Sequence, residues 1–298
     1  MSISNKHNHI LPIRGINFSQ QSADQIDDLY QQVLANGMHG LCFSAYEEGQ
    51  HPDDDKLTEE QIKRRMKILA PYTKWTRTFS CIEGNELIPP IAKAEGIKTM
   101  VGAWISDDLE KNEQEIDGLI QLAKQGQVDI AAVGNEVLLR GDISEQQLLD
   151  YIEKVKSALP NTQVGYVDAY YEFTINPRIT EACEVVLINC YPFWEGCHID
   201  YSLPYMQQMY HQAKAAAGNS KQVIIAETGW PSKGTNFGDS LPSEQNFKKY
   251  FINTQLWAKR DNIDVMYFTS FDESWKVGAE GDVGAYWGIW NKEEQLKF

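Results

Sequence analysis

Residues 223–232 read Val223-Ile224-Ile225-Ala226-Glu227-Thr228-Gly229-Trp230-Pro231-Ser232. The run of β-branched apolar residues is typical of a strand that is buried on both faces, and the glycine and proline end it. A second stretch, residues 128–136, follows the same pattern and ends in Gly134-Asn135-Glu136. Each of these predicted strands therefore ends in a glutamate, at the position where barrels of parallel strands carry their catalytic residues.

Two carboxyl groups at strand ends are what cleavage of a glycosidic bond requires. One carboxyl group protonates the leaving oxygen, and the other attacks the sugar or activates water. The competing interpretation is that Glu136 and Glu227 are ordinary surface or salt-bridged residues. Unpaired carboxylates are rarely placed at the ends of buried strands, so the pattern favours an enzyme that acts on glycosides.

Short apolar strands alternate with amphipathic helices along the whole chain, which predicts an α/β fold. The strand candidates are residues 13–19, 40–46, 75–81, 98–104, 128–136, 163–168, 185–190, 222–227 and 265–271. Counted from residue 40, they give a (β/α)8 TIM barrel in which Glu136 ends the fourth strand and Glu227 the seventh. Because no linker or low-complexity segment interrupts the pattern, residues 1–298 are expected to form a single catalytic domain.

Residues 1–39 precede this barrel and are expected to be an N-terminal extension packed on it. They are predicted to hold an extra strand at residues 13–19 and a helix near residues 22–35. No helix is evident after the final strand, so we hypothesise that this helix fills the gap in the outer ring. Capping-box spacing predicts three more helix starts, at Thr58 with Gln61, Asn112 with Glu115, and Ser144 with Gln147.

The charge of the chain bears on its partners. The 42 acidic against 27 basic residues give a formal net charge of −15. Such a charge repels nucleic acid and anionic membranes, and the basic stripe that phosphate contacts need is missing. The chain also has no membrane-spanning apolar run, and residues 1–9 lack the apolar core of a signal peptide. From the charge and the lack of an apolar run, we expect neither a nucleic-acid nor a membrane partner. The protein either stays inside the cell or has lost a leader.

The five cysteines are an odd number without a CxxC pair and are expected to be buried free thiols, with a bridge between Cys190 and Cys197 left open. The others are Cys42, Cys81 and Cys183. The histidines are scattered, and the acidic loop 47–55 lacks the spacing and glycine of a calcium loop. We therefore expect no metal and no cofactor.

Four blocks of the sequence resemble glycoside hydrolase family 17, the β-1,3-glucanase family, which is built on a TIM barrel. The blocks are Gly134-Asn135-Glu136, Asn189-Cys190-Tyr191-Pro192, Glu227-Thr228-Gly229-Trp230-Pro231-Ser232 and Phe271-Asp272-Glu273-Ser274-Trp275-Lys276. They occur in the family's order within residues 40–295. The block with Gly-Trp-Pro-Ser is quite specific, whereas related barrel hydrolases share Gly-Asn-Glu.

The resemblance implies a retaining double displacement, with Glu136 as the acid/base and Glu227 as the nucleophile. In a retaining enzyme the two carboxyl groups stand about 5 to 5.5 Å apart. Their mutual repulsion, with an apolar environment around one of them, pushes the two pKa values apart and keeps the acid protonated near neutral pH. Asn135 resembles the family position that hydrogen-bonds the sugar 2-hydroxyl.

Glu273 and Lys276 match the family's Glu-x-x-Lys after the last strand. The resemblance implies that the ammonium either lowers the pKa of Glu227 or binds sugar hydroxyls, and the alternative is an ordinary structural ion pair. The chain departs from the plant pattern at Asp272, where the plant enzymes usually carry Asn. This adds a negative charge near the site.

Aromatic residues gather after the predicted strands, and pyranose rings pack their C–H faces on flat aromatic surfaces. Any one of them alone is more readily explained as a core residue, but as a group at one end of a barrel they favour a sugar groove. The candidate sugar-binding aromatics are Tyr46, Phe79, Tyr191, Phe193, Trp230 and Trp275, within a group that also holds Trp104, Tyr170, Tyr171, Trp194, Tyr286 and Trp287. Tyr191 lies beside the family's catalytic-site tyrosine position, and Trp230 is expected to form a wall behind Glu227.

These observations predict a monomeric endo-β-1,3-glucanase that cleaves laminarin-like β-1,3-glucan polysaccharide or oligosaccharide with retention. The main alternative is a β-1,3-glucanosyltransferase, which passes the sugar to another sugar instead of water. Nothing in the two glutamates distinguishes these activities. A non-catalytic glucan-binding protein is disfavoured, because it would not need two mutually repelling carboxylates. An extracellular or periplasmic location would suit a polymer substrate.

Overall fold

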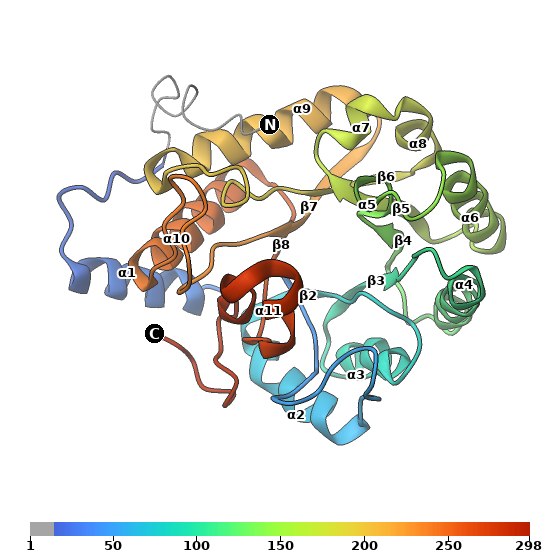
Figure 1. Ribbon diagram of the computed structural model, residues 1–298, viewed down its shortest axis with the longest axis horizontal. Helices are drawn as coiled ribbons and strands as arrows, with labels where there is room; N and C mark the ends of the chain where they lie inside the picture. Colours follow the sequence, from blue (N-terminus) through green and yellow to red (C-terminus); the bar gives the residue numbers. More distant parts are fainter. Residues whose placement is uncertain (1–14) are drawn as a thin grey trace.

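The apolar segments after residue 37 form parallel strands that close into a barrel (Figure 1). The structure, a computed structural model, describes residues 15–298. The strands are β1 (Met38–Cys42), β2 (Thr73–Arg77), β3 (Lys98–Ala103), β4 (Ile130–Asn135), β5 (Gln163–Ala169), β6 (Val185–Asn189), β7 (Gln222–Thr228) and β8 (Val265–Tyr267). Each strand pairs with the next, and β8 pairs with β1. The predicted (β/α)8 barrel is confirmed, with Glu136 directly after β4 and Glu227 near the end of β7.

Helices follow the strands, and the longer ones surround the barrel on its outside (Figure 1). They are α1 (Ala23–Ala35), α2 (Glu59–Leu69), α3 (Ile88–Ala94), α4 (Leu109–Lys124), α5 (Val137–Arg140), α6 (Glu145–Ala158), α7 (Glu172–Ile175), α8 (Pro177–Ala182), α9 (Ser202–Ala217), α10 (Glu244–Asp261) and α11 (Val277–Glu280). The capping boxes predicted at Thr58 and Ser144 are present. The one predicted at Asn112 is wrong, because α4 begins after Asp108 and the buried Asn112 side chain exchanges two hydrogen bonds with the backbone of Ser106 instead.

Helix α1 packs against α10 on the outside of the barrel (Figure 1). Its fully buried Tyr30 ring lies 5.1 Å from the ring of Phe251 and 6.0 Å from that of Phe298, measured between centroids. The extra strand predicted before this helix is wrong in its described part, residues 15–19, while residues 13 and 14 lie outside the described residues. The Ile16 amide donates to the side chain of Asn253 at 2.8 Å instead of to a strand, since the closed barrel leaves no edge to pair with.

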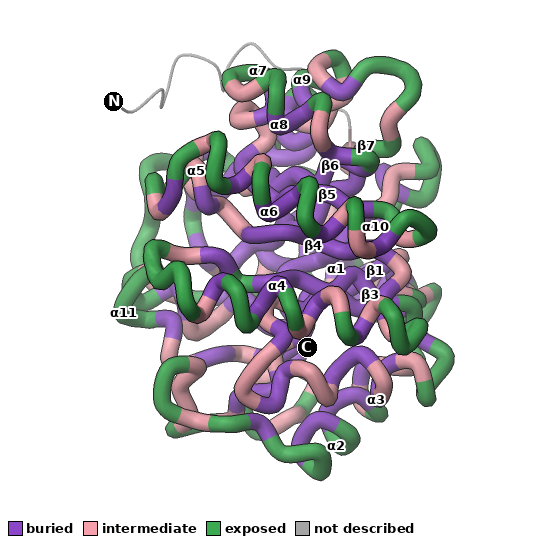
Figure 2. The backbone as a smooth tube through the Cα atoms, turned by 90° about the vertical axis from the view of Figure 1, so that its right-hand side faces the viewer, coloured by how far each residue is buried: buried purple, intermediate pink, exposed green. Residues whose placement is uncertain are grey.

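The interior of the barrel is built from the β-branched strand residues that the sequence pattern singled out. All residues of β6 are buried, and only the first residue of β7 is exposed. Figure 2 shows the buried backbone running through the middle of the molecule, with exposed segments on the outer helices. The five cysteines are buried and free, as predicted, so Cys190 and Cys197 form no bridge.

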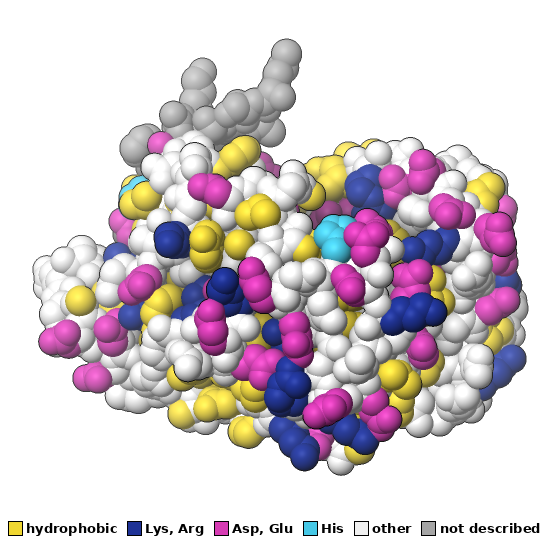
Figure 3. All heavy atoms as spheres, turned by 60° about the horizontal axis from the view of Figure 1, so that its bottom comes forward, with side chains coloured by type: hydrophobic (Ala, Val, Ile, Leu, Met, Phe, Trp, Pro, Cys, Tyr) yellow, Lys and Arg dark blue, Asp and Glu magenta, His cyan; other side chains and the backbone are white. Residues whose placement is uncertain are grey.

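On the face drawn in Figure 3, acidic and basic side chains are interspersed. No helix within residues 15–298 is long and apolar enough to cross a membrane.

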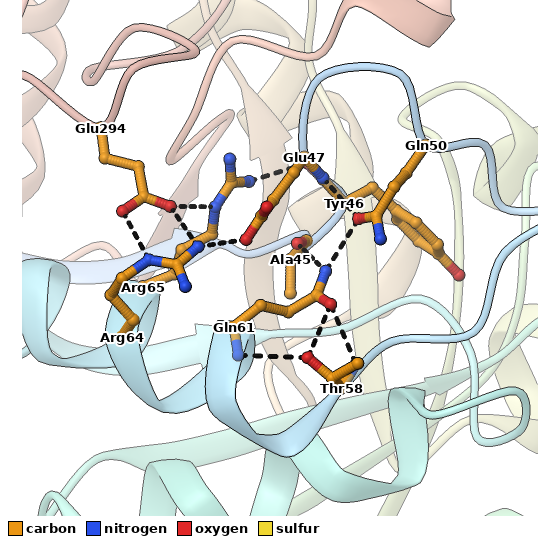
Figure 4. Close-up of polar contacts among 9 residues, drawn as sticks. All are labelled: Ala45, Tyr46, Glu47, Gln50, Thr58, Gln61, Arg64, Arg65 and Glu294. Atoms are coloured by element: carbon orange, nitrogen blue, oxygen red, sulfur yellow. Dashed lines mark hydrogen bonds and ion pairs between the residues drawn. The ribbon is translucent and has the colours of Figure 1, made fainter.

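An ion-pair cluster ties the end of the chain to α2 (Figure 4). The carboxylate of Glu294 accepts a hydrogen bond from Nε of Arg64 and one from Nε of Arg65, each at 2.9 Å. Arg65 is buried, donates to the carbonyl oxygen of Tyr46 at 2.8 Å, and lies 4.4 Å from the ring centroid of Phe271. One guanidinium therefore holds together the segments that follow β1 and β8 and the C-terminal residues.

We expect Arg65→Met to lower the free energy of unfolding by about 2 to 4 kcal/mol, because it leaves the Glu294 carboxylate and the Tyr46 carbonyl short of a buried donor. The matched control is Lys63→Met on the same helix. Lys63 pairs with Glu59, and both side chains are more than half exposed, so its loss should cost less than about 0.5 kcal/mol. Urea unfolding measures both changes, and equal effects would contradict a structural role for the cluster.

Candidate active site

A pocket of about 300 Å³ opens among the residues that follow the strands, and both predicted glutamates line it. Aromatic side chains form much of its wall, and a further carboxyl group comes from α11. The lining residues are Glu136, Leu139, Ala169, Tyr170, Tyr171, Asn189, Tyr191, Trp194, Glu195, Met209, Glu227, Phe268, Glu280 and Trp287. The structure thus brings together Glu136 and Glu227, which lie far apart in the chain.

Glu136 occupies the turn between β4 and α5 with a left-handed backbone, at φ 52° and ψ 30°. Non-glycine residues rarely adopt this conformation, and it is concentrated at functional sites. One carboxyl oxygen of Glu136 accepts a hydrogen bond from the Asn189 side chain at 2.8 Å. Burial, and next the negative charge of Glu227, raise the pKa of Glu136 to about 7. At neutral pH this carboxyl group holds a proton in a large fraction of molecules.

Glu227 lies in a different environment. Its side chain is 8% exposed and forms an ion pair with the buried guanidinium of Arg77. Its second oxygen accepts a hydrogen bond from the Tyr191 hydroxyl at 2.7 Å. A cation and a hydroxyl donor therefore both contact the Glu227 carboxyl group, whereas the Glu136 carboxyl group accepts from a neutral amide.

Arg77 and Asn189 connect the two glutamates through Asn135. The second guanidinium nitrogen of Arg77 donates to the side-chain oxygen of Asn135 at 2.8 Å, and the Asn189 amide lies 3.4 Å from the same oxygen. Arg77 also lies over the ring of Phe79, 4.4 Å from its centroid. This network fixes the side chain of Asn135 between the two carboxyl groups.

The Glu273–Lys276 pair lies behind the pocket lining. The Lys276 ammonium is 2.7 Å from the carboxylate of Glu273 and 4.0 Å from the ring centroid of Phe268, and both charged residues are buried. The direct cationic partner of Glu227 is Arg77, not Lys276. The extra charge of Asp272 is balanced by Lys297 at 3.0 Å, so the departure from the plant pattern carries its own counter-ion.

The predicted sugar-binding aromatics divide between the pocket and the core. Only Tyr191 among them lines the pocket. Phe193 and Trp230 are fully buried with ring centroids 5.3 Å apart, and the Trp230 indole donates to the carbonyl of Leu241. The predicted direct contact of these two rings with a sugar is therefore wrong, because neither ring reaches the surface.

Tyr46, Phe79 and Trp275 lie outside the pocket lining. The Tyr46 hydroxyl accepts a hydrogen bond from Asn85, and its ring meets Trp275 edge to face at 6.4 Å. The pocket walls come instead from other members of the aromatic group, Tyr170, Tyr171, Trp194 and Trp287.

The predicted site residues did not include Arg77, Asn189 or Glu280. Arg77 had a visible signal, because an arginine within the predicted strand 75–81 needs a partner if the strand buries it, as β2 does. Asn189 belongs to one of the four blocks that resemble the family, but the resemblance assigned no role to Asn189. Glu280 has no local signal: it ends a four-residue helix, and only the fold buries it, which raises its pKa to about 7.

No cluster of three or more His, Cys, Asp or Glu side chains placed to hold a metal ion occurs in the part of the chain that the structure describes. The pocket offers a carboxyl group that can give a proton, Glu136, and a second carboxyl group paired with a cation, Glu227. Together they can protonate a leaving oxygen and attack the carbon that bears it.

Comparison with known proteins places this site in a family. A family model described as the BtgE/BtgC glycoside hydrolase domain matches residues 40–288. Two curated relatives, each named glucan 1,3-beta-glucosidase, come from Arthroderma benhamiae and Saccharomyces cerevisiae. The first is 28% identical over 89% of this chain and 91% of its own length, and the second 29% over 78% and 82%.

Among solved structures, the glycoside hydrolase family 17 beta-1,3-glucanosyltransferase from Rhizomucor miehei superposes with a TM-score of 0.78 at 30% identity, covering 88% of this chain and 96% of that one. An active-site mutant of that enzyme has been solved in complex with laminaritriose. With these matches over most of its length, the chain belongs to glycoside hydrolase family 17 and carries the BtgE/BtgC glycoside hydrolase domain.

Proposed function

We propose that this protein is a retaining endo-β-1,3-glucanase in which Glu136 is the acid/base and Glu227 the nucleophile. The observation that carries the proposal is the asymmetry between the two glutamates. Burial raises the pKa of Glu136 to about 7, whereas Glu227 is paired with Arg77 and Tyr191. One carboxyl group is thus prepared to give a proton and the other to attack, which is the division of labour in a double displacement.

In the first step, Glu136 protonates the glycosidic oxygen while a Glu227 oxygen attacks the anomeric carbon. The bond to the leaving sugar breaks, and a covalent glycosyl-enzyme forms. In the second step, the Glu136 carboxylate takes a proton from water, which attacks the same carbon and releases Glu227. Asn135, held by Arg77, is the proposed partner of the sugar 2-hydroxyl.

The substrate class is supported by the names of the relatives, which are glucan 1,3-beta-glucosidases, and by the laminaritriose complex of the Rhizomucor miehei enzyme. The aromatic walls Tyr170, Tyr171, Trp194 and Trp287 suit the C–H faces of glucose rings. We further propose that the protein acts as a monomer without nucleic-acid or membrane partners, in keeping with its net charge of −15.

A second candidate function is glucanosyl transfer. The Rhizomucor miehei enzyme, at 30% identity, is named a beta-1,3-glucanosyltransferase. Transfer uses the same glycosyl-enzyme, and a sugar hydroxyl replaces water as the acceptor in the second step. The two activities therefore share Glu136 and Glu227 and differ in the acceptor of the second step, and hence in their products.

A time course with a β-1,3-linked glucose hexamer, with products sized by mass spectrometry, tests the proposal. Shorter products alone support the hydrolase, and products longer than the hexamer support the transferase. A β-1,4-linked hexamer serves as the comparison substrate. If it alone is cut, the proposed linkage is wrong, and if neither is cut, the proposed activity is wrong.

We expect kcat/KM for the β-1,3 hexamer to fall as the pH rises through about 7, because Glu136 must carry its proton in the first step and its pKa is raised to about 7. The control is an aryl glycoside whose dinitrophenolate leaving group needs no proton, so this alkaline limb should be absent from its profile. An alkaline limb near the ordinary carboxyl value of about 4.3 would contradict the assignment of Glu136.

A further inference from the structure

Glu136 is the N-cap residue of α5, but its side chain does not cap the helix. An N-cap side chain ordinarily accepts a hydrogen bond from the first amides of its helix. Here the Glu136 carboxyl group lines the pocket and accepts from Asn189. The amides at the start of α5 must therefore find acceptors elsewhere, or remain unsatisfied at a cost in stability.

Two side chains of the neighbouring strand β5 supply these acceptors. The hydroxyl oxygen of Tyr166 accepts a hydrogen bond from the amide of Leu138 at 2.9 Å. The carboxylate of Asp168 accepts from the amide of Leu139 at 3.4 Å, and from that of Ala169 at 2.7 Å. Tyr166 also donates its hydroxyl proton to Asp168. Both residues are fully buried, so water does not compete for these bonds.

The backbone around Glu136 is shaped to fit this pair. The pairing of β4 with β5 shifts register between Ala132 and Asn135, so β4 bulges just before the turn. Gly134 has a φ of 84°, and a Cβ there would come within 2.7 Å of the Val137 side chain, so the turn requires glycine at this position. The amide of Glu136 itself donates to the carbonyl of Val167 at 2.8 Å. Strand β5 therefore holds the amide of Glu136 and the first free amides of α5.

We propose that Tyr166 and Asp168 are positioning residues for the acid/base, which take over the capping of α5 and so leave the carboxyl group of Glu136 free to face the substrate. The inference rests on the proposed function of Glu136. Neither residue lines the pocket, so neither touches the sugar, and both act through the geometry and charge of Glu136.

Asp168 also acts on Glu136 through its charge. Besides Asp168 from β5, the charged or titratable groups around Glu136 are Glu227 from β7, Arg140 from α5 and Tyr171 ahead of α7. The negative charges of Glu227 and Asp168 disfavour loss of the Glu136 proton, and Arg140 opposes them. Burial raises the pKa of Asp168 to about 6, while the hydrogen bonds from Tyr166 and from the amides of Ala169 and Leu139 oppose this rise.

The variants Tyr166→Phe and Asp168→Asn test this inference with two substrates. With the β-1,3 hexamer, which needs the proton, we expect kcat/KM to fall by at least about tenfold in each variant. With an aryl β-laminaribioside whose leaving group is 2,4-dinitrophenolate, kcat/KM should change by less than about threefold, because the first step then needs no acid. In Asp168→Asn, the fall of kcat/KM for the hexamer at alkaline pH should begin at a lower pH than in the wild type.

Two control variants separate positioning from general loss of structure. Tyr30→Phe removes a buried hydroxyl that has no hydrogen-bond partner among the described residues, and Asp129→Asn alters a carboxylate at the opposite end of β4. Both control variants should leave unchanged the ratio of kcat/KM for the hexamer to kcat/KM for the aryl substrate. Equal losses on both substrates in Tyr166→Phe and Asp168→Asn, or no loss on either, would overturn the inference. A wild-type protein that cleaves no β-1,3-glucan would instead overturn the proposed function.

Discussion

Glu227→Gln is expected to lower kcat for the β-1,3 hexamer by about 10⁴-fold or more, because an amide cannot attack the anomeric carbon and no covalent intermediate forms. Binding should survive, since glutamine keeps the size of the side chain and can still accept the Tyr191 hydroxyl. The measurement pairs initial rates with a titration of the inactive variant by the hexamer. Glu181→Gln, an exposed glutamate on α8, is the matched control and should retain full activity.

Azide rescue distinguishes the roles of the two glutamates, because the alanine variants should form glycosyl azides of opposite stereochemistry. In Glu227→Ala, azide can enter the space of the missing carboxylate and attack a dinitrophenyl β-glycoside directly, which gives the α-glycosyl azide. In Glu136→Ala, the covalent intermediate still forms and azide replaces water, which gives the β-glycosyl azide. The opposite pairing of variants and products would reverse the assigned roles.

The barrel could be predicted from the sequence because its strands are buried on both faces. Such strands appear as continuous apolar runs, and the positions of Glu136 and Glu227 follow directly from where these runs end. The extra strand predicted before α1 is wrong in its described part, residues 15–19, because a local pattern does not show whether a partner strand is free. Ile13 to Ser19 has a strand-like composition, but strand formation needs an edge, and whether an edge is free depends on the closure of the whole sheet.

Only part of the site could be predicted from the sequence. The predictable residues are those that stand at the end of a strand, because the strand itself places them in the site. Trp230 and Phe193 stand beside catalytic motifs, yet the side chains that follow a barrel strand can turn into the core as readily as into the pocket, and these two turned inward. Asn112 shows the same limit in a helix. Its spacing to Glu115 fits a capping box, but its partner is the backbone of Ser106, in the loop before α4.

Arg77 is the residue whose importance depends most on contacts distant in sequence. It belongs to β2, whereas Glu227 belongs to β7 and Asn135 to β4, and its guanidinium joins all three. No local pattern links positions so far apart. A buried arginine without a carboxylate would be very costly, so its presence in a strand indicates a partner without identifying it.

Arg77→Met is expected to lower kcat for the β-1,3 hexamer by about 10²-fold, because the nucleophile loses its cation and Asn135 loses the donor that orients it. It should also lower the free energy of unfolding at neutral pH by about 3 to 5 kcal/mol, the cost of leaving a buried carboxylate unpaired. Urea unfolding and initial rates measure the two effects on the same preparations.

The double variant Arg77→Met/Glu227→Gln shows whether the charge itself is responsible. If the single variant is unstable because Glu227 is left as an uncompensated buried anion, removing that charge as well should restore a large part of the lost stability, although activity stays absent. If the double variant is as unstable as Arg77→Met, the loss comes instead from the packing of Arg77 on Phe79 and its bond to Asn135. The cycle thus separates the stability that Arg77 contributes as the counter-ion of Glu227 from the stability that it contributes by packing and by its bond to Asn135.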